Sequence, residues 1–269
     1  MVARAGLLVW ALLPAFCVMG SAQPAKSYPP KSYVWEAVRA ELAASAADHS
    51  LWLYYEVDRK PGDGAVQWAA ETRMGELDRM LQKDGHPLSL AQQRGKMDAF
   101  IRDTAAQARQ RRGGRHDDRQ AALMLNMLPN AFLWTITGRR DGATTLHFRP
   151  DPGFRPPTWE TRVFAAMEGD MVVDDTHFRI ESLKGRMIRQ VKFGWGVFGE
   201  IEPGGTFDVE RRQIGKGIWQ ITETHVHIQG HALIFKNISE QEDDVKSRFQ
   251  ELPANIDFRD AEEKLLAQP

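Results

Sequence analysis

Residues 191–210, VKFGWGVFGEIEPGGTFDVE, decide the fold class that we predict for this chain. Apolar and aromatic residues alternate here with polar residues or glycine, which is the pattern of a β-strand with one buried face. Glycines inside a strand pattern indicate a bulge, a sharp bend or a close backbone approach. Residues 202–205 (EPGG) are typical of a turn, because proline fixes φ and glycine tolerates positive φ. We therefore expect a curved hairpin within a larger antiparallel sheet.

Similar segments occur on both sides of this stretch. Regularly spaced strands with tight turns predict an antiparallel meander that curls into a barrel, a half-barrel or a sandwich. An amphipathic helix is expected at 33–47, with Val34, Val38 and Leu42 on one stripe, and a short helix at 260–266. Further strands are expected at 51–57, 65–74, 76–82, 132–137, 144–148, 163–174, 178–183, 217–228 and 232–239. The fold class is thus α+β, with a curved antiparallel sheet and an N-terminal helix.

A helical hairpin is predicted as an insertion at about 89–128. Ser89 and Gln92 form a capping box before the first helix, Gly113-Gly114 ends that helix, and the second runs over 117–128. The basic residues Arg109, Arg111, Arg112 and Arg115 suggest an anion site, but we favour a solvated helix end, where cations suit the C-terminal dipole.

The composition of the 269 residues is that of an ordinary globular protein, with 42% hydrophobic and 26% charged residues. The net charge of -1 gives no electrostatic reason to expect a nucleic acid or an anionic membrane surface as partner.

The N-terminus has the pattern of a secretory signal peptide at 1–22, followed by a flexible leader at 23–32 and one β-rich domain at 33–269. Lipidation of Cys17, the only cysteine, is not expected because Phe16 precedes it instead of a small residue. After cleavage the chain would have no cysteine and no membrane segment, which favours a periplasmic or secreted protein without disulfides.

His225 and His227 are the candidate metal ligands, because side chains two residues apart in a strand point to one face. Glu223 shares that face, and His231 follows the expected turn at Gly230. No hydrolase helix motif accompanies them, so we favour ordinary exposed histidines and predict no metal and no cofactor. The acidic residues within 168–175 are interpreted as turn residues rather than as a general acid and base.

Aromatic side chains remain as the strongest functional signal. An unclosed barrel leaves an apolar concavity that can bind a ligand, whereas a closed one fills its interior with such side chains. The candidate lining residues are Trp52, Trp134, Phe164, Met167, Phe193, Trp195 and Phe198.

Four stretches carry a resemblance to a known family: LPNAFLW (128–134), LHFRPDPGFRPPTWETRVFAAMEGDMVVD (146–174), VKFGWGVFGEIEPGGTFDVE (191–210) and HIQGHALIFKNIS (227–239). In these the chain resembles a family of uncharacterised secreted bacterial proteins. Its architecture looks like the unclosed β-barrel of the periplasmic lipoprotein carriers LolA and LolB, in which a curved sheet closed on one side by helices holds acyl chains. The long insertion at 89–128 and the absence of a carrier motif depart from that pattern.

Three functions follow as hypotheses. The first is a non-catalytic periplasmic carrier for an apolar small molecule, a lipid or a lipoprotein acyl chain. The second is an envelope module with a filled barrel that binds another protein. The third is a metal-dependent hydrolase that uses His225 and His227, in which zinc would activate a water molecule.

Overall fold

The computed structural model describes residues 29–193, 199–228, 230–231 and 240–269. Its helices are α1 (Pro30–Ala47), α2 (Leu90–Arg102), α3 (Thr104–Ala131), α4 (Trp159–Phe164) and α5 (Phe258–Leu266). Its strands are β1 (Leu51–Asp58), β2 (Ala65–Thr72), β3 (Gly75–Lys83), β4 (His86–Pro87), β5 (Phe132–Arg140), β6 (Ala143–Pro150), β7 (Met167–Asp174), β8 (Ile180–Met187), β9 (Val191–Phe193), β10 (Gly199–Ile201), β11 (Thr206–Gly215), β12 (Ile218–Ile228), β13 (Gly230–His231) and β14 (Glu240–Leu252).

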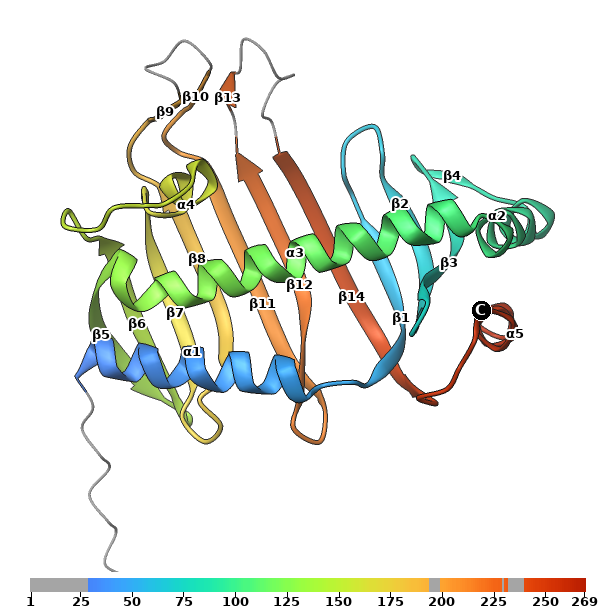
Figure 1. Ribbon diagram of the computed structural model, residues 1–269, viewed down its shortest axis with the longest axis horizontal. Coiled ribbons are helices and arrows are strands. Elements are labelled where there is room, and N and C mark those ends of the chain that lie inside the picture. The colour runs from blue at the N-terminus through green and yellow to red at the C-terminus, as the bar shows by residue number, and fades with distance from the viewer. Residues whose placement is uncertain (1–28, 194–198, 229, 232–239) are drawn as a thin grey trace, which may run out of the picture.

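One large antiparallel sheet organises these elements. Its eleven strands run in the order β4-β3-β2-β1-β14-β12-β11-β8-β7-β6-β5, so β4 and β5 are free edges and the sheet is not closed. This confirms the predicted α+β class and the large antiparallel sheet. A separate three-stranded sheet, β13-β10-β9, projects beyond one end of the main sheet (Figure 1).

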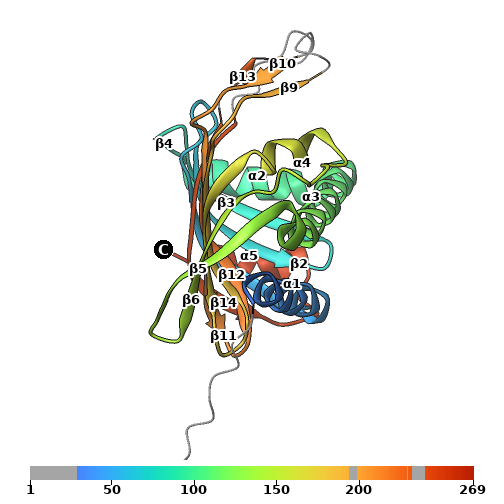
Figure 2. The same ribbon diagram turned by 90° about the vertical axis from the view of Figure 1, so that its left-hand side faces the viewer.

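The sheet is curved, and α1 and α3 lie on one of its faces, which we call the inner face (Figure 2). At the β5–β8 end this face is a filled apolar core, in which Val34 and Val38 of α1 and Leu128 of α3 pack with Leu146 and Met171. At the β1–β3 end, α2 and α5 pack on the outer face, because they contact Leu53, Trp68 and Leu77, whose neighbours along the strands point the other way.

The insertion differs from the predicted hairpin. The capping box of Ser89 and Gln92 is confirmed, but the first helix ends at Arg102, and Asp103 caps the N-terminus of α3 by accepting a hydrogen bond from Ala106 N at 2.8 Å. The prediction that Gly113-Gly114 ends a helix is therefore wrong: one continuous helix of 28 residues passes through both glycines. Figure 1 shows α3 running across the sheet while α2 is seen nearly along its axis.

The turn in the deciding stretch is confirmed, with φ of +96° at Gly204, but the hairpin around it is wrong. The strands on its two sides are not partners, since β10 pairs with β9 and β13, whereas β11 pairs with β8 and β12. The turn therefore connects the small sheet to the large one.

Two further differences from the sequence predictions concern residues 163–174 and β14. Val163 and Phe164 belong to α4 instead of a strand, because Thr158 and Thr161 form a capping box. The strand expected at 232–239, like the signal peptide at 1–22, lies outside the described residues. β14 was not expected at all, yet it lies at the centre of the sheet, where Val245 faces Val57 on one side and Glu223 on the other.

Candidate functional site

The middle of α3 packs against no other element of the described part of the chain. All eight residues from Arg112 to Arg119 are exposed, so more than two turns of helix are exposed on every side. The helix is attached before and after this segment. Gln110 accepts a hydrogen bond from Glu76 N at 2.9 Å and donates one to Glu76 O at 3.1 Å, and at the other end Met127, Leu128 and Ala131 enter the apolar core. The exposed segment therefore bridges the inner face of the sheet.

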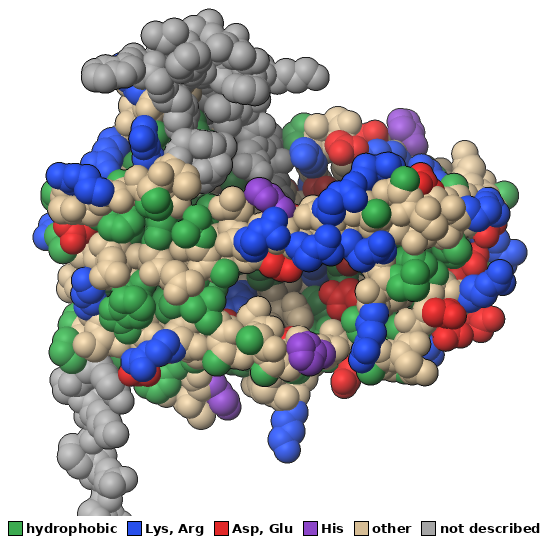
Figure 3. Space-filling model, viewed as in Figure 1, with side chains coloured by type: hydrophobic (Ala, Val, Ile, Leu, Met, Phe, Trp, Pro, Cys, Tyr) green, Lys and Arg blue, Asp and Glu red, His purple; other side chains and the backbone are tan. Residues whose placement is uncertain are grey.

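A hollow of about 540 Å³ lies beside this bridge. Its walls are the last turns of α1, Asp118 of α3, Glu71 of β2 and the turn between β11 and β12 with Trp219. Figure 3 shows it as an opening between the bands of α1 and α3, with acidic and basic side chains inside. This hollow is the candidate site.

A buried ionic group forms one wall. Glu41 of α1 is 4% exposed and accepts hydrogen bonds from Arg179 at 3.0 Å and from Ile180 N at 2.7 Å, and it also pairs with Arg211. Burial alone would raise the pKa of Glu41, but the hydrogen bond from Arg179 and the charge of Arg211 outweigh burial and hold that pKa below its usual value. Glu41 is thus a charged residue that attaches α1 to β8 and β11.

Two donors at this wall, Arg179 Nε and Trp219 Nε1, are buried and have no hydrogen-bond partner among the described residues. Arg179 lies over the ring of Trp219, with 5.9 Å from Cζ to the ring centroid. Buried donors in folded proteins are almost always satisfied by protein, water or ligand. The wall is therefore suited to a group that accepts hydrogen bonds.

Acidic side chains form the part of the inner face next to the hollow. Glu71 and Glu76 are direct cross-strand partners, and Tyr54 donates a hydrogen bond to Glu76. Burial, and after it the charge of Glu76, raises the pKa of Glu71 to about 7. Burial likewise raises the pKa of Asp78 well above its usual range. Burial thus favours the protonated form of both carboxyl groups.

Aromatic side chains lie behind these carboxylates. Phe249 of β14 packs against Trp52 and Tyr54 of β1, with ring centroids 6.3 and 5.5 Å apart. Ile218, which lines the hollow, packs against the same cluster. The site thus has mainly polar walls, and Ile218 connects them to a buried aromatic cluster.

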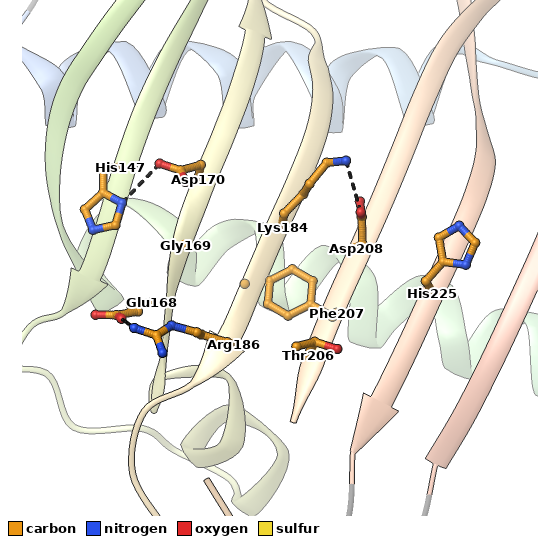
Figure 4. Close-up of a pocket in the computed structure, with 11 residues that line it drawn as sticks. His147, Glu168, Gly169, Asp170, Lys184, Arg186, Thr206, Phe207, Asp208 and His225 are labelled. Atoms are coloured by element: carbon orange, nitrogen blue, oxygen red, sulfur yellow. Dashed lines mark hydrogen bonds and ion pairs between the residues drawn. The ribbon is translucent and has the colours of Figure 1, made fainter. Parts of the chain in front are cut away.

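The outer face of the sheet carries a second depression, of about 590 Å³ (Figure 4). It is open, and its charges are paired across neighbouring strands. His147 contacts Asp170 at 3.0 Å, and Lys184 contacts Asp208 at 3.0 Å. Because these groups already contact one another on an exposed surface, we favour the inner hollow as the site.

The structure separates the residues that the sequence nominated for one groove. Trp134, Phe164 and Met167 lie together in the filled core, where Trp134 Nε1 donates a hydrogen bond to Leu128 O at 3.0 Å. Trp52 belongs to the aromatic cluster behind the hollow. Phe193 is part of β9, and Trp195 and Phe198 lie outside the described residues.

The histidines of β12 lie on the outer face. His225 Nδ1 is 3.0 Å from Asp243, and His225 Nε2 is 3.7 Å from Glu223. Within the part of the chain that the structure describes, no group of three or more His, Cys, Asp or Glu side chains could hold a metal ion.

The sequence did not predict the buried ionic group of Glu41, Arg179 and Arg211. The available signal was Glu41 itself, which follows Val34 and Val38 at helical spacing and so places a carboxylate on the buried stripe of α1. Arg179 and Arg211 carry no such signal, because charged residues are common both beside strands and on their exposed faces.

The chain was compared with protein-family models, with curated proteins and with solved structures, and nothing matched it. The similarity to lipoprotein carriers therefore stays a prediction. Among the described helices, none is both long and apolar enough to cross a membrane.

Proposed function

We propose that the protein is a non-catalytic binding or carrier module of the periplasm. Its ligand is an apolar or amphipathic molecule, such as a lipid or an acyl chain, held on the inner face beside α3. The observation that carries this proposal is the unpacked bridge of α3 over a hollow of about 540 Å³, a volume within the usual range of ligand sites.

The chemistry of the walls supports an amphipathic ligand. The unpartnered donors of Arg179 and Trp219 suit an oxygen-containing head group, and the apolar side chains of Ala44 and Ile218, which line the hollow, suit an apolar part. Each methylene buried there would contribute about 0.8 kcal/mol. The hollow also favours a carrier over the alternative of a protein-binding module with a filled interior.

The test is native mass spectrometry with lipid extraction on protein purified from a bacterial periplasm. Ala44 of α1 lines the hollow, whereas Ala46 is exposed and does not. We expect a bound mass in the acyl or phospholipid range. Ala44→Trp, which places a bulky side chain in the hollow, should abolish this bound mass, and the control Ala46→Trp should keep it. A clean mass of the unbound wild-type protein would contradict the proposal, as would equal retention by both variants.

A further inference from the structure

Five basic side chains share one side of α3: Arg109, Arg112, Arg115, His116 and Arg119, which we call the basic stripe. All five residues are exposed. At 3.6 residues per turn they fall within about a third of the helix circumference and extend over roughly 15 Å. The net charge of the whole chain, -1, conceals this local concentration.

The basic stripe faces away from the sheet. Gln110 contacts the backbone of Glu76 and Asp118 lines the hollow, so these two residues mark the inward side of the helix. Basic side chains are visible along the middle of α3 in Figure 3, on the side of the molecule on which the hollow opens.

The stripe does not help the helix to form. Arg112 lies three residues from both Arg109 and Arg115, and Arg115 lies four residues from Arg119, spacings at which like charges destabilise a helix. Among the described residues, only Arg109 of the stripe has an ion-pair partner, Asp103 at 3.8 Å.

The sequence predicted that these basic residues lie at a helix end, where the helix dipole would favour them, but their position contradicts this prediction. These residues lie inside α3 instead of at a helix C-terminus, so the dipole does not favour them, and that interpretation is wrong. The glycine pair within the same segment weakens the helix further relative to alanine. Within the described part of the chain, no ion pair offsets the charges of Arg112, Arg115 and Arg119.

We propose that the basic stripe docks the protein on an anionic lipid surface through its phosphate groups. All but one of the stripe residues are arginines, whose planar guanidinium binds phosphate in a bidentate way. Residues 109–119 contain no apolar side chain, whereas the core of a protein–protein interface is apolar and aromatic. A straight, purely basic row therefore fits a plane of phosphates better than a protein partner.

A protein docked through the basic stripe would also have the opening of the hollow turned toward the lipid surface. That consequence rests on the proposed carrier function, because it gives a lipid ligand a direct route in or out. The docking itself does not depend on a ligand, so the two proposals fail separately: vesicle binding tests the stripe, and lipid extraction with Ala44→Trp tests the hollow.

The experiment is co-sedimentation of the full chain with vesicles of phosphatidylcholine alone or with about a third phosphatidylglycerol, at low and at high salt. The test variant is Arg112→Gln/Arg115→Gln/Arg119→Gln. The control, Arg139→Gln/Arg140→Gln/Arg259→Gln, removes the same charge from exposed residues on β5 and α5. Circular dichroism establishes that all the proteins are folded.

We expect the wild-type protein and the control to bind the anionic vesicles only, and to be released by salt. The test variant should bind roughly 100-fold more weakly, since each of the three arginines contributes about 1 kcal/mol to binding near such a surface. Equal binding by the test variant would overturn the proposal, as would absence of wild-type binding at low salt. Binding of soluble polyglutamate without binding of vesicles would also overturn it and assign the stripe to an acidic protein.

Discussion

Glu41 of α1 accepts a hydrogen bond from Nη2 of Arg179 at 3.0 Å, a contact between residues 138 positions apart in the chain. Both residues are more than nine-tenths buried, at 4% and 7% exposure. With Arg211 on the other side of the carboxylate, the pair fixes the C-terminal half of α1 above β8 and β11. This contact holds one wall of the hollow in place.

Replacement of Glu41 by glutamine should destabilise the protein by about 3 to 5 kcal/mol, because the buried guanidinium of Arg179 and the partly buried one of Arg211 lose their counter-charge. The free energy of unfolding is measured by urea denaturation. The matched control on the same helix is Glu36→Gln, which removes an exposed pair with Arg39 and should change stability by about 0.5 kcal/mol or less. Equal effects of the two substitutions would show that the buried group contributes little.

The stability of the protein should fall as the pH rises from about 5 to about 7. The pKa of Glu71 in the folded state, about 7, lies above its usual value of 4.5, so in this interval the folded state binds more protons than the unfolded state. The stabilising contribution is therefore fully present below the unfolded pKa and is lost as pH passes through the folded pKa.

Urea denaturation between pH 5 and pH 8 measures this slope. The variant Glu71→Gln should reduce it, whereas Glu263→Gln, an exposed substitution on α5, should leave it unchanged. A wild-type stability that rises across the same interval would contradict the raised pKa of Glu71 in the folded state.

The sheet could be predicted from the sequence largely because its strands alternate apolar and polar residues. β14 could not, because its thirteen residues, EQEDDVKSRFQEL, contain few apolar side chains. Its central position depends on long-range partners such as Lys246, which pairs with Glu56 of β1 at 3.2 Å and lies over the ring of Tyr54. Such a strand carries no hydrophobic period that a local pattern could reveal.

The site was harder to predict than the fold. Trp52 and Trp134 have the same local signal, an aromatic residue within a strand, yet one lies behind the hollow and the other fills the core beneath α1 and α3. The difference depends on where α3 crosses the sheet. That path follows from the helix break at Asp103, where the sequence predicted continuation, and from the uninterrupted helix at Gly113 and Gly114, where it predicted an end.

Gly169→Ala should destabilise the protein by about 1 to 3 kcal/mol, the range for overpacked sites. A Cβ at Gly169 would lie 1.9 Å from Lys184 O and 2.6 Å from Gly185 Cα, so the backbones of β7 and β8 would have to separate. The control is Gly138→Ala in β5, where the nearest atoms of Thr145 are 4.0 Å away. Thermal unfolding measures both, and a tolerated Gly169→Ala would disprove the close approach of these two strands.

Gly113→Ala and Gly114→Ala should each stabilise the protein, by up to about 1 kcal/mol, because alanine favours a helix more than glycine does. Neither site has an atom within 4 Å of an added Cβ, so no contact opposes the change. Gly217→Ala should have the opposite effect, since its φ of +77° in the β11–β12 turn is unfavourable for alanine. Urea denaturation measures all three, and hydrogen exchange at 112–119 should slow in the two α3 variants. Destabilisation by both helix substitutions would mean that this segment is not helical, and the bridge over the hollow would then have to be rejected.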